Sequence, residues 1–239
     1  MTEPGMRVED VDFEQVYRGD TPLGHRVPWD LGAPQPAVVA LAEAGEFTGE
    51  VLDVGCGLGD NAVFLASRGL RVTGLDGAPS ALAQARDRAA VVGADVTFAL
   101  ADATKLEGWE GRFDTVLDSA LYHCLPEPKR HEYAAALARA TRPGARLHLF
   151  AFSQSVPSTF PGPFRITEAD LGATIGRHWT IDAIEPAEYT TSLTSTELRA
   201  SARSFAGDDD VDLSELDRLG TDEDGQILVP VWHLSAHRA

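Results

Sequence analysis

The sequence of 239 residues predicts an α/β fold with a doubly wound, mostly parallel sheet and helices on both faces. Apolar runs of strand length alternate with helical runs along residues 50–153, and a glycine-rich turn follows the first strand. With 44% hydrophobic and 24% charged residues, the composition is that of a globular chain with one large core. Because no repeat or obvious linker interrupts the chain, we predict a single domain over residues 1–239.

The predicted elements follow one another in a regular β–α order. Gly69 and Gly93 close two of the helices, and Pro79 stands in the first turn of one of them. In chain order we expect strands at 50–55, 70–76, 95–100, 113–120 and 145–153, helices at 60–69, 79–93 and 128–141, and a turn at the "RPG" of residues 142–144.

The last third of the chain has a different pattern. A short helix at 167–176 precedes two strands, 179–189 and 226–237. Little helix is expected between these closing strands, which predicts an antiparallel final strand at one edge of the sheet. We divide the domain into a cap segment (1–47), a core (48–153) and closing elements (154–239).

The cap segment is predicted to be ordered. It is rich in proline, glycine and aromatic residues, and it contains Phe13, Tyr17 and Trp29. Leaving these rings in water would be costly, so we expect the segment to fold over the carboxyl edge of the sheet.

Net charge and cysteine content exclude several classes of partner. A formal net charge of −17 repels nucleic acid and anionic lipid, which leaves small molecules as the expected partners. The acidic run 207–225 is interpreted as a solvated loop or lid, with an interaction surface as the alternative. Two cysteines make no disulfide framework, and the sequence has neither a membrane-length apolar run nor a secretory pattern at its start, so we expect a cytoplasmic protein.

The stretch "VLDVGCGLGD", residues 51–60, carries the first site prediction. A dinucleotide-binding turn has the pattern G-x-G-x-x-G, but Asp60 occupies the position of its third glycine. Alternate glycines also let an amino-acid moiety lie against the backbone. Asp53, in the strand before the turn, is then expected to receive a cationic amine directly or through water.

Two further acids end the next strands. Asp76 lies about 20 residues past the glycines, where a carboxylate accepts both hydroxyls of a ribose. Asp102, with the backbone of Ala103, stands where an adenine amino group is bound. This placement fits two cofactors, NAD and S-adenosylmethionine. The alternative interpretations are a helix cap for Asp76 and an ordinary turn residue for Asp102.

Residues 48–153 resemble the class I S-adenosylmethionine-dependent methyltransferases through "VLDVGCGLG", "GLDGAPSALAQAR", "ADAT" and "FDTVLDS". The resemblance implies a Rossmann-like sheet of seven strands with the last one antiparallel, and S-adenosylhomocysteine as product. It also implies cofactor contacts from Gly55, Cys56 and Gly57 (methionine part), Asp76 (ribose), Asp102 and Ala103 (adenine), and Asp118 and Ser119 (facing methyl transfer). Trp29, Asp53 and Gly77 are further candidates for cofactor binding.

A narrower resemblance concerns the substrate. "PWDLGAPQP" is similar to the N-terminal segment of thiol, halide and thiopurine methyltransferases. Over nearly the whole chain the sequence resembles the actinobacterial heterocyclic-toxin methyltransferases. This implies methylation of a hydroxyl (or ring nitrogen) of a small quinolone-like or phenolic compound, with a detoxifying role, by a monomer or weak homodimer.

"DSALYHCLP", residues 118–126, supplies the candidate catalytic groups Asp118, Tyr122 and His123. His123 is interpreted as a general base or a substrate-orienting group, with a capping or packing histidine as the alternative. Tyr122 is expected to pack against the cofactor or substrate ring. An acidic phenol or hydroxyquinoline ionises easily, so an enzymic base is not required.

Aromatic residues are the remaining substrate-binding candidates. Trp29 is expected to form a wall against the sulfonium or the substrate, with core packing as the alternative, and Tyr17 is a weaker candidate of the same kind. Phe152, Phe160 and Phe164 follow the fifth strand and are candidates for an apolar pocket or for ordinary core packing. The seven histidines lack the spacing of a metal site, so no metal is predicted.

Three other functions stay open at this point. A thiol, halide or amine acceptor fits the same fold. An NAD-dependent oxidoreductase would have to bind its cofactor despite Asp60. A non-catalytic S-adenosylmethionine-binding module is the alternative outside enzymes.

Overall fold

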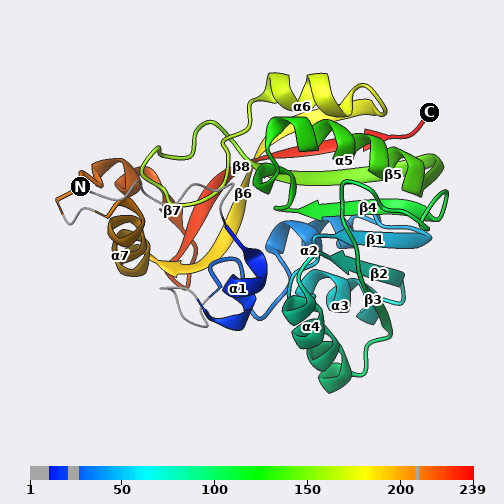
Figure 1. Ribbon diagram of the computed structural model, residues 1–239, viewed down its shortest axis with the longest axis horizontal. Helices are drawn as coiled ribbons and strands as arrows, with labels where there is room; N and C mark the ends of the chain where they lie inside the picture. Colours follow the sequence, from blue (N-terminus) through cyan, green and yellow to red (C-terminus); the bar gives the residue numbers. More distant parts are fainter. Residues whose placement is uncertain (1–10, 21–26, 208–209) are drawn as a thin grey trace.

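The structure is a computed structural model that describes residues 11–20, 27–207 and 210–239. Its centre is a sheet with the strand order β3-β2-β1-β4-β5-β8-β6, and the short β7 pairs with β8 (Figure 1). The strands are β1 (Glu50–Val54), β2 (Arg71–Asp76), β3 (Val96–Leu100), β4 (Phe113–Ser119), β5 (Thr141–Phe152), β6 (Thr180–Thr194), β7 (Gly220–Thr221) and β8 (Gln226–His237). The predicted mostly parallel α/β sheet with an antiparallel last strand is confirmed.

Helices cover both faces of the sheet, and the strands alternate their apolar residues between them (Figure 1). Val51 and Leu117 face a core built with α2, α3 and α4, whereas Leu52 and Val116 face one built with α5 and α6. The helices are α1 (Phe13–Arg18), α2 (Pro36–Glu43), α3 (Asp60–Ser67), α4 (Pro79–Val92), α5 (Glu127–Ala140), α6 (Glu168–Ile175) and α7 (Ser195–Ala206), with 3₁₀ turns η2 (Tyr122–Cys124) and η3 (Ser214–Arg218).

The predicted edge position of the last strand is wrong. β8 lies between β5 and β6 and pairs antiparallel with both, so β6 and β3 form the edges of the main sheet. The burial pattern gives the reason: apolar residues such as Val229, Val231 and Leu234 are buried in β8, whereas β6 exposes Asp182 and Glu185. A strand with two paired neighbours buries more apolar surface than an edge strand does.

Two local predictions also differ from the structure. The helix α7 lies between β6 and β8, where little helix was expected; a capping box of Thr194 and Glu197 begins it and Gly207 ends it. The predicted turn at 142–144 is part of β5, which starts at Thr141. Burial of Thr141 and its pairing with Phe113 extend the strand through these residues.

The described part of the cap segment packs on the sheet as expected. In α1, Glu14 accepts hydrogen bonds from the backbone N–H and the hydroxyl of Ser80 at the start of α4. Gln35, before α2, donates to the carbonyl of Thr190 in β6 at 2.9 Å. Residues 1–10 and 21–26 of the predicted cap lie outside the described residues.

The acidic run is more ordered than a solvated loop in its described residues, 207 and 210–225. Leu213 and Leu216 are buried, and η3 and β7 form within the run. Its two residues 208–209 lie outside the described residues.

Candidate active site

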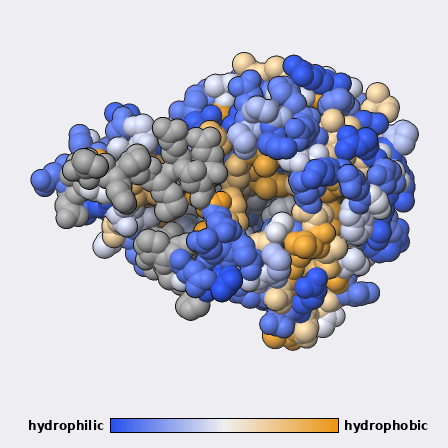
Figure 2. All heavy atoms as spheres, in the orientation of Figure 1, coloured by the Kyte–Doolittle hydropathy of each residue, from blue (hydrophilic) through white to orange (hydrophobic). Residues whose placement is uncertain are grey.

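A cavity of about 1200 Å³ opens where the parallel strands reach their carboxyl ends. Its walls come from the glycine turn after β1, the ends of β2 to β5, the cap segment, β6 and α7. Apolar side chains border a hollow near the middle of the face in Figure 2. The volume exceeds that of a site for one drug-sized ligand, so it is large enough for a cofactor together with a second molecule.

The glycine turn forms the floor of this cavity. The backbone N–H groups of Gly55 and Cys56 donate to the carbonyl of Leu75 at 2.7 and 3.0 Å, and the N–H of Gly57 donates to Asp76 at 2.8 Å. Gly57 has a φ of +52°, and a Cβ there would lie 2.8 Å from the hydroxyl of Tyr17. The glycine is therefore required both by the backbone conformation and by the closeness of the cap.

Asp53 lies beneath the turn and does not line the cavity. It is 1% exposed, and neither carboxyl oxygen has a hydrogen bond of good geometry. Burial raises its pKa to about 8, the carboxylates of Asp76 and Asp118 add to the rise, and the backbone N–H of Ala62 offsets only part of it. A buried carboxyl without a partner marks a place where a cationic group would be stabilised.

Asp76 is held at the cavity wall. Its two oxygens accept from the backbone N–H groups of Gly57 and Ala78, each at 2.8 Å, and free lone pairs remain for a ligand. Burial raises its pKa, whereas these backbone hydrogen bonds lower it. Gly77 also lines the cavity, and a Cβ there would be in ordinary contact with the backbone oxygen of Ala101, at 3.9 Å.

Asp102 and Ala103 line the same cavity after β3, as the sequence predicts. One oxygen of Asp102 accepts from the backbone and hydroxyl of Thr104, and the other forms an ion pair with Lys105 at 3.0 Å. The hydrogen bond from Thr104 is the main cause of its lowered pKa. The carboxylate is therefore ionised and fixed in direction at the cavity rim.

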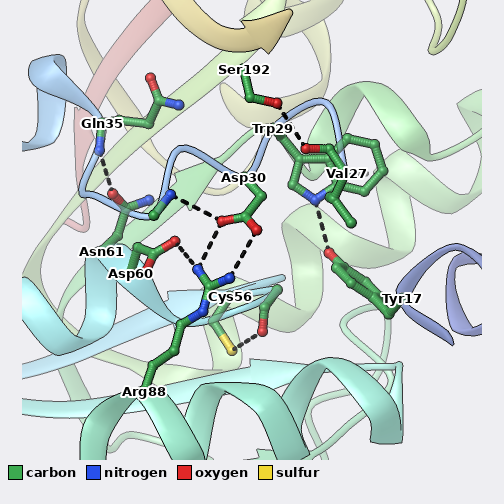
Figure 3. Close-up of polar contacts among 12 residues, drawn as sticks. Tyr17, Val27, Trp29, Asp30, Gln35, Cys56, Asp60, Asn61, Arg88 and Ser192 are labelled. Atoms are coloured by element: carbon green, nitrogen blue, oxygen red, sulfur yellow. Dashed lines mark hydrogen bonds and ion pairs between the residues drawn. The ribbon is translucent and has the colours of Figure 1, made fainter. Parts of the chain in front are cut away.

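Tyr17 and Trp29 close the cavity from the cap (Figure 3). The indole Nε1–H of Trp29 donates to the Tyr17 hydroxyl at 3.0 Å, and the two rings meet edge to face. Because its oxygen accepts this bond, the hydroxyl of Tyr17 keeps its own proton available to donate. Both residues lie close to Gly57 of the glycine turn, in the segment that the sequence predicts to fold over the carboxyl edge of the sheet.

Arg88 of α4 connects the cap to the helix that follows the glycine turn (Figure 3). Its guanidinium binds both oxygens of Asp30 at 2.8 Å and also binds Asp60 at 2.6 Å. Asp60 is the first residue of α3 and replaces the third glycine of a dinucleotide turn. Its carboxylate therefore forms an ion pair. The next residue, Asn61, accepts a hydrogen bond from the backbone N–H of Gln35.

Asp118 does not reach the cavity. It is 0% exposed and accepts hydrogen bonds from the backbone N–H groups of Leu121 and Tyr122 and from the hydroxyl of Tyr133. Burial raises its pKa to about 7, although these hydrogen bonds lower it. The hydrogen bonds of this carboxylate hold the loop after β4 in place. Its neighbour Ser119 does line the cavity.

The loop that Asp118 holds sends Tyr122 and His123 in different directions. Ala120 has a φ of +82°, an uncommon value for a residue other than glycine, and the η2 turn follows it. Tyr122 is buried away from the cavity, with its hydroxyl donating to Asp170 at 3.1 Å and Arg130 over its ring. The sequence suggested that Tyr122 packs against the cofactor or substrate ring. The structure does not place it there, because the helical turn directs its side chain into the core formed with α5 and α6.

His123 lines the cavity with only 2% of its surface exposed. Its Nδ1 accepts the backbone N–H of Phe152 at 3.0 Å, and its ring stacks on the Phe152 ring at 4.2 Å. Burial lowers its pKa to about 3, and the positive charges of Arg130 and Arg165 lower it further. The imidazole is therefore neutral, and with Nδ1 an acceptor its proton is on Nε2.

The three phenylalanines have different places. Phe152 and Phe160 line the cavity and meet edge to face. Phe164 does not line it and instead packs under the guanidinium of Arg130. The expected apolar pocket after β5 is thus built by Phe152 and Phe160.

Sequence reasoning missed Tyr189, Arg88 and Asp30. Tyr189, in β6, lines the cavity with its hydroxyl 3.4 Å from that of Ser119. No local pattern identifies these residues, because each is brought to the site by an element distant in sequence. In the described part of the chain, no group of three or more His, Cys, Asp or Glu residues is arranged to hold a metal ion. In the same residues, every helix is too short or too polar to cross a bilayer.

Comparisons with known proteins agree with this geometry. A family model described as a methyltransferase domain matches residues 51–144. The 2-heptyl-1-hydroxyquinolin-4(1H)-one methyltransferase of Mycobacteroides abscessus is 36% identical over 230 residues, which is 95% of this chain and 96% of that protein. A solved structure reported for the conversion of a disulfide bond into a thioacetal group in echinomycin biosynthesis is 35% identical, with a TM-score of 0.78 over 95% of this chain and 91% of that one.

A third protein, a methyltransferase from Anabaena variabilis, shares the fold at 17% identity, with a TM-score of 0.69 over 100% of this chain and 98% of that one. The chain belongs to the class I S-adenosylmethionine-dependent methyltransferases. Within that class it is close to the heterocyclic-toxin type, as the sequence predicts. This membership sets aside the oxidoreductase alternative.

Proposed function

We propose that the enzyme methylates a hydroxyl group of a small heterocyclic aromatic or phenolic compound. The observation that carries the proposal is one cavity that joins the glycine turn and Asp76 at one end to His123, Phe152 and Tyr189 at the other. An apolar, aromatic end with a single hydrogen-bonding histidine suits a flat heterocycle. The relative from Mycobacteroides abscessus is named for a hydroxyquinolone acceptor, which supports this substrate class.

The residues present fit S-adenosylmethionine. We assign the methionine part to the turn at Gly55, Cys56 and Gly57, above the unpartnered carboxyl of Asp53. Asp76 and Gly77 would hold the ribose, and Asp102 with Ala103 the adenine. When bound, the cofactor supplies a methyl group on a positively charged sulfur, which is a good leaving group.

The protein's own contribution is positioning and exclusion of water. Tyr17 and Trp29 cover the turn, and Phe152 and Phe160 give the acceptor end an apolar wall. Holding two reactants in a productive geometry lowers the barrier by about 7–11 kcal/mol in favourable cases. With a pKa of about 3, and with the lone pair of Nδ1 already accepting the backbone N–H of Phe152, His123 is poorly suited to its predicted role as general base, and we assign it to orientation of the acceptor.

The test is a methyl-transfer assay with labelled S-adenosylmethionine and a panel of hydroxyquinolones, phenols, thiols, halides and amines. Transfer to the hydroxylated heterocycles supports the proposal, and transfer restricted to another acceptor class overturns it. Thermal-shift titrations should give a strong response to S-adenosylmethionine and S-adenosylhomocysteine and none to NAD.

A sulfur acceptor is the second candidate, because the echinomycin protein at 35% identity is reported for chemistry on a disulfide. The thiol members of the panel distinguish a sulfur acceptor from a hydroxyl acceptor.

We further propose that the enzyme works in the cytoplasm, in a detoxifying role and as a monomer or weak homodimer. The acidic surface and the two cysteines support the cytoplasmic location.

A further inference from the structure

Positive charge acts on His123 at the acceptor end of the cavity, whereas the carboxylate of Asp118 acts on Cys124 and Tyr189 in the same wall. The guanidinium groups of Arg130 and Arg165 both act on His123 through their charge. Arg130 is paired with Asp170 at 3.2 Å. Arg165, in contrast, binds only the carbonyls of Pro157, Phe160 and Pro163, and among the described residues no carboxylate lies within ion-pair distance of it. Its charge is therefore left uncompensated close to the cavity.

The hydrogen bonding of His123 decides what it offers to a ligand. Because Nδ1 accepts from the backbone of Phe152, the ring donates through Nε2–H and has no lone pair free to remove a proton. Among the described residues Nε2 has no hydrogen-bond partner. It is also not one of the fully buried polar atoms that lack a partner. The stack on Phe152 fixes the ring plane, so the donor has one direction.

The other titratable groups near this end do not replace the missing base. Burial raises the pKa of the Tyr189 hydroxyl and of the Cys124 thiol far above neutrality. Asp118 is enclosed by its three hydrogen-bond donors and does not line the cavity. None of these neighbours of His123 is placed to accept a proton, and a fixed donor near an unpaired cation suits a ligand that already carries negative charge.

We propose that the acceptor binds as an anion, with the Nε2–H of His123 donating a hydrogen bond to its ionised oxygen. The proton is lost to water before binding. The ionised oxygen then forms a bond to the methyl carbon while the carbon–sulfur bond breaks, and the electron pair of that bond stays on sulfur. No proton moves within the site. This inference rests on the proposed function and narrows the substrate class to acidic hydroxyls, such as N-hydroxy heterocycles and electron-poor phenols.

The first test measures binding without turnover. The probe is 2-heptyl-1-hydroxyquinolin-4(1H)-one, or 4-nitrophenol, titrated by absorbance against the protein saturated with S-adenosylhomocysteine, since ionisation changes the spectrum of each. We expect the apparent pKa of the bound probe to fall by at least one unit relative to water. A bound probe that stays protonated above its solution pKa overturns the proposal, as does failure of both probes to bind.

Two substitutions of His123 distinguish loss of the Nε2–H donor from damage to the local fold. His123→Asn keeps an oxygen that can accept the backbone N–H of Phe152 but removes the Nε2 donor, so the lowered pKa of the bound probe should be lost. His123→Gln places an amide donor near the position of Nε2 and should restore part of the shift. The matched control is His148→Asn, a buried histidine that pairs with His233 outside the cavity; it should leave the probe pKa unchanged.

Kinetics give the second readout. For acceptors of different acidity, kcat/KM should rise with pH along each acceptor's own ionisation curve. A rising limb at one fixed pKa for all acceptors would reveal an enzymic base and contradict the proposal. If no hydroxyl acceptor is methylated, the proposed function fails, whereas the absorbance titration still decides whether the site binds an anion.

Discussion

Arg88 and Asp30 form a two-pronged ion pair, with each terminal nitrogen of the guanidinium 2.8 Å from one carboxyl oxygen. Asp60 completes the group from the first turn of α3, and the three side chains are 20–30% exposed. The group joins the cap to the glycine turn across elements far apart in sequence. Because Tyr17 and Trp29 belong to the same cap, we expect this ion pair to help hold them over the glycine turn.

Replacing Arg88 should therefore weaken cofactor binding more than turnover. A partly buried two-pronged pair contributes on the order of 1–2 kcal/mol, which corresponds to roughly a 5–30-fold change in affinity. We expect Arg88→Ala to raise the Kd for S-adenosylhomocysteine by about tenfold in calorimetry, with kcat at saturating cofactor nearly unchanged. Arg88→Lys should be intermediate, since a point charge cannot bind both oxygens of Asp30 in the same way.

The control for this variant is Arg71→Ala. Arg71 forms an exposed pair with Glu50 at the amino ends of β1 and β2, the opposite edge of the sheet. Its loss should change neither affinity nor kcat. Equal Kd values for Arg88→Ala and the wild type would show that the cap keeps its place without the ion pair.

Gly57→Ala should abolish cofactor binding in a folded protein. The substitution adds a methyl group 2.8 Å from the Tyr17 hydroxyl at a φ of +52°, so the cap must move away from the turn. Gly93→Ala is the matched control, because Gly93 has a φ of +69° and open space around its Cβ position. Both variants should lose roughly 1 kcal/mol of stability through backbone strain. Only Gly57→Ala should lose the calorimetric response to S-adenosylhomocysteine.

Without ligand, the stability of the protein should fall as the pH rises from 7 to 8. Asp53 and Asp118 have folded-state pKa values of about 8 and about 7, above the ordinary value near 4, so the folded state binds more protons than the unfolded state in this window. Each such proton gives a slope of up to about 1.4 kcal/mol per pH unit. The buried histidines oppose this fall near pH 6.5: the folded-state pKa values of His123 and His148 are about 3 and about 4, whereas an unfolded histidine is still half protonated near pH 6.5. Their opposition fades above pH 7, where the fall is expected. Thermal unfolding at a series of pH values measures the slope.

Asp53→Asn should make the ligand-free protein more stable at pH 8 and above, because it removes a buried carboxylate without a hydrogen-bond partner. Its stability should fall less between pH 7 and 8 than that of the wild type. An unchanged slope would mean that Asp53 does not titrate in this range.

The same carboxyl makes cofactor affinity depend on pH. A cationic amine bound at the glycine turn favours the ionised form of Asp53, so affinity for S-adenosylhomocysteine should increase as the pH rises toward 8 and then level off. In Asp53→Asn the affinity should be weaker and independent of pH over this range. Calorimetry at pH 6.5, 7.5 and 8.5 gives the comparison, with Asp182→Asn on the exposed edge strand as the control.

The cofactor half of the molecule could be predicted from sequence because its signals are local. Each strand from β1 to β5 is followed closely by the turn or helix that places its functional residue, as with Asp76 before Pro79. The order of β5, β8 and β6 could not be predicted in the same way. Strand pairing there is decided between segments far apart in the chain, and the apolar pattern of a strand does not say how many neighbours it has.

The directions of the side chains at the acceptor end also could not be predicted from the local sequence. Tyr122 and His123 are adjacent, yet one enters the core and the other the cavity, because a tight turn follows the left-handed backbone at Ala120. The role of His123 then depends on a single backbone N–H from Phe152. Neither the turn nor the N–H donor has a sequence signature. From the sequence alone, a general-base role for His123 therefore stayed open.

The position of β8 has a consequence for synthesis on the ribosome. Among the described residues β6 pairs in the main sheet with β8 alone, and β8 is translated later, so the strand that carries Tyr189 has no partner until β8 has been made. The strands β1 to β5 depend on no such delayed pairing. The nascent chain therefore builds the crevice for the methyl donor before it encloses the acceptor, and the slow, non-local step of folding is the one that completes the substrate wall.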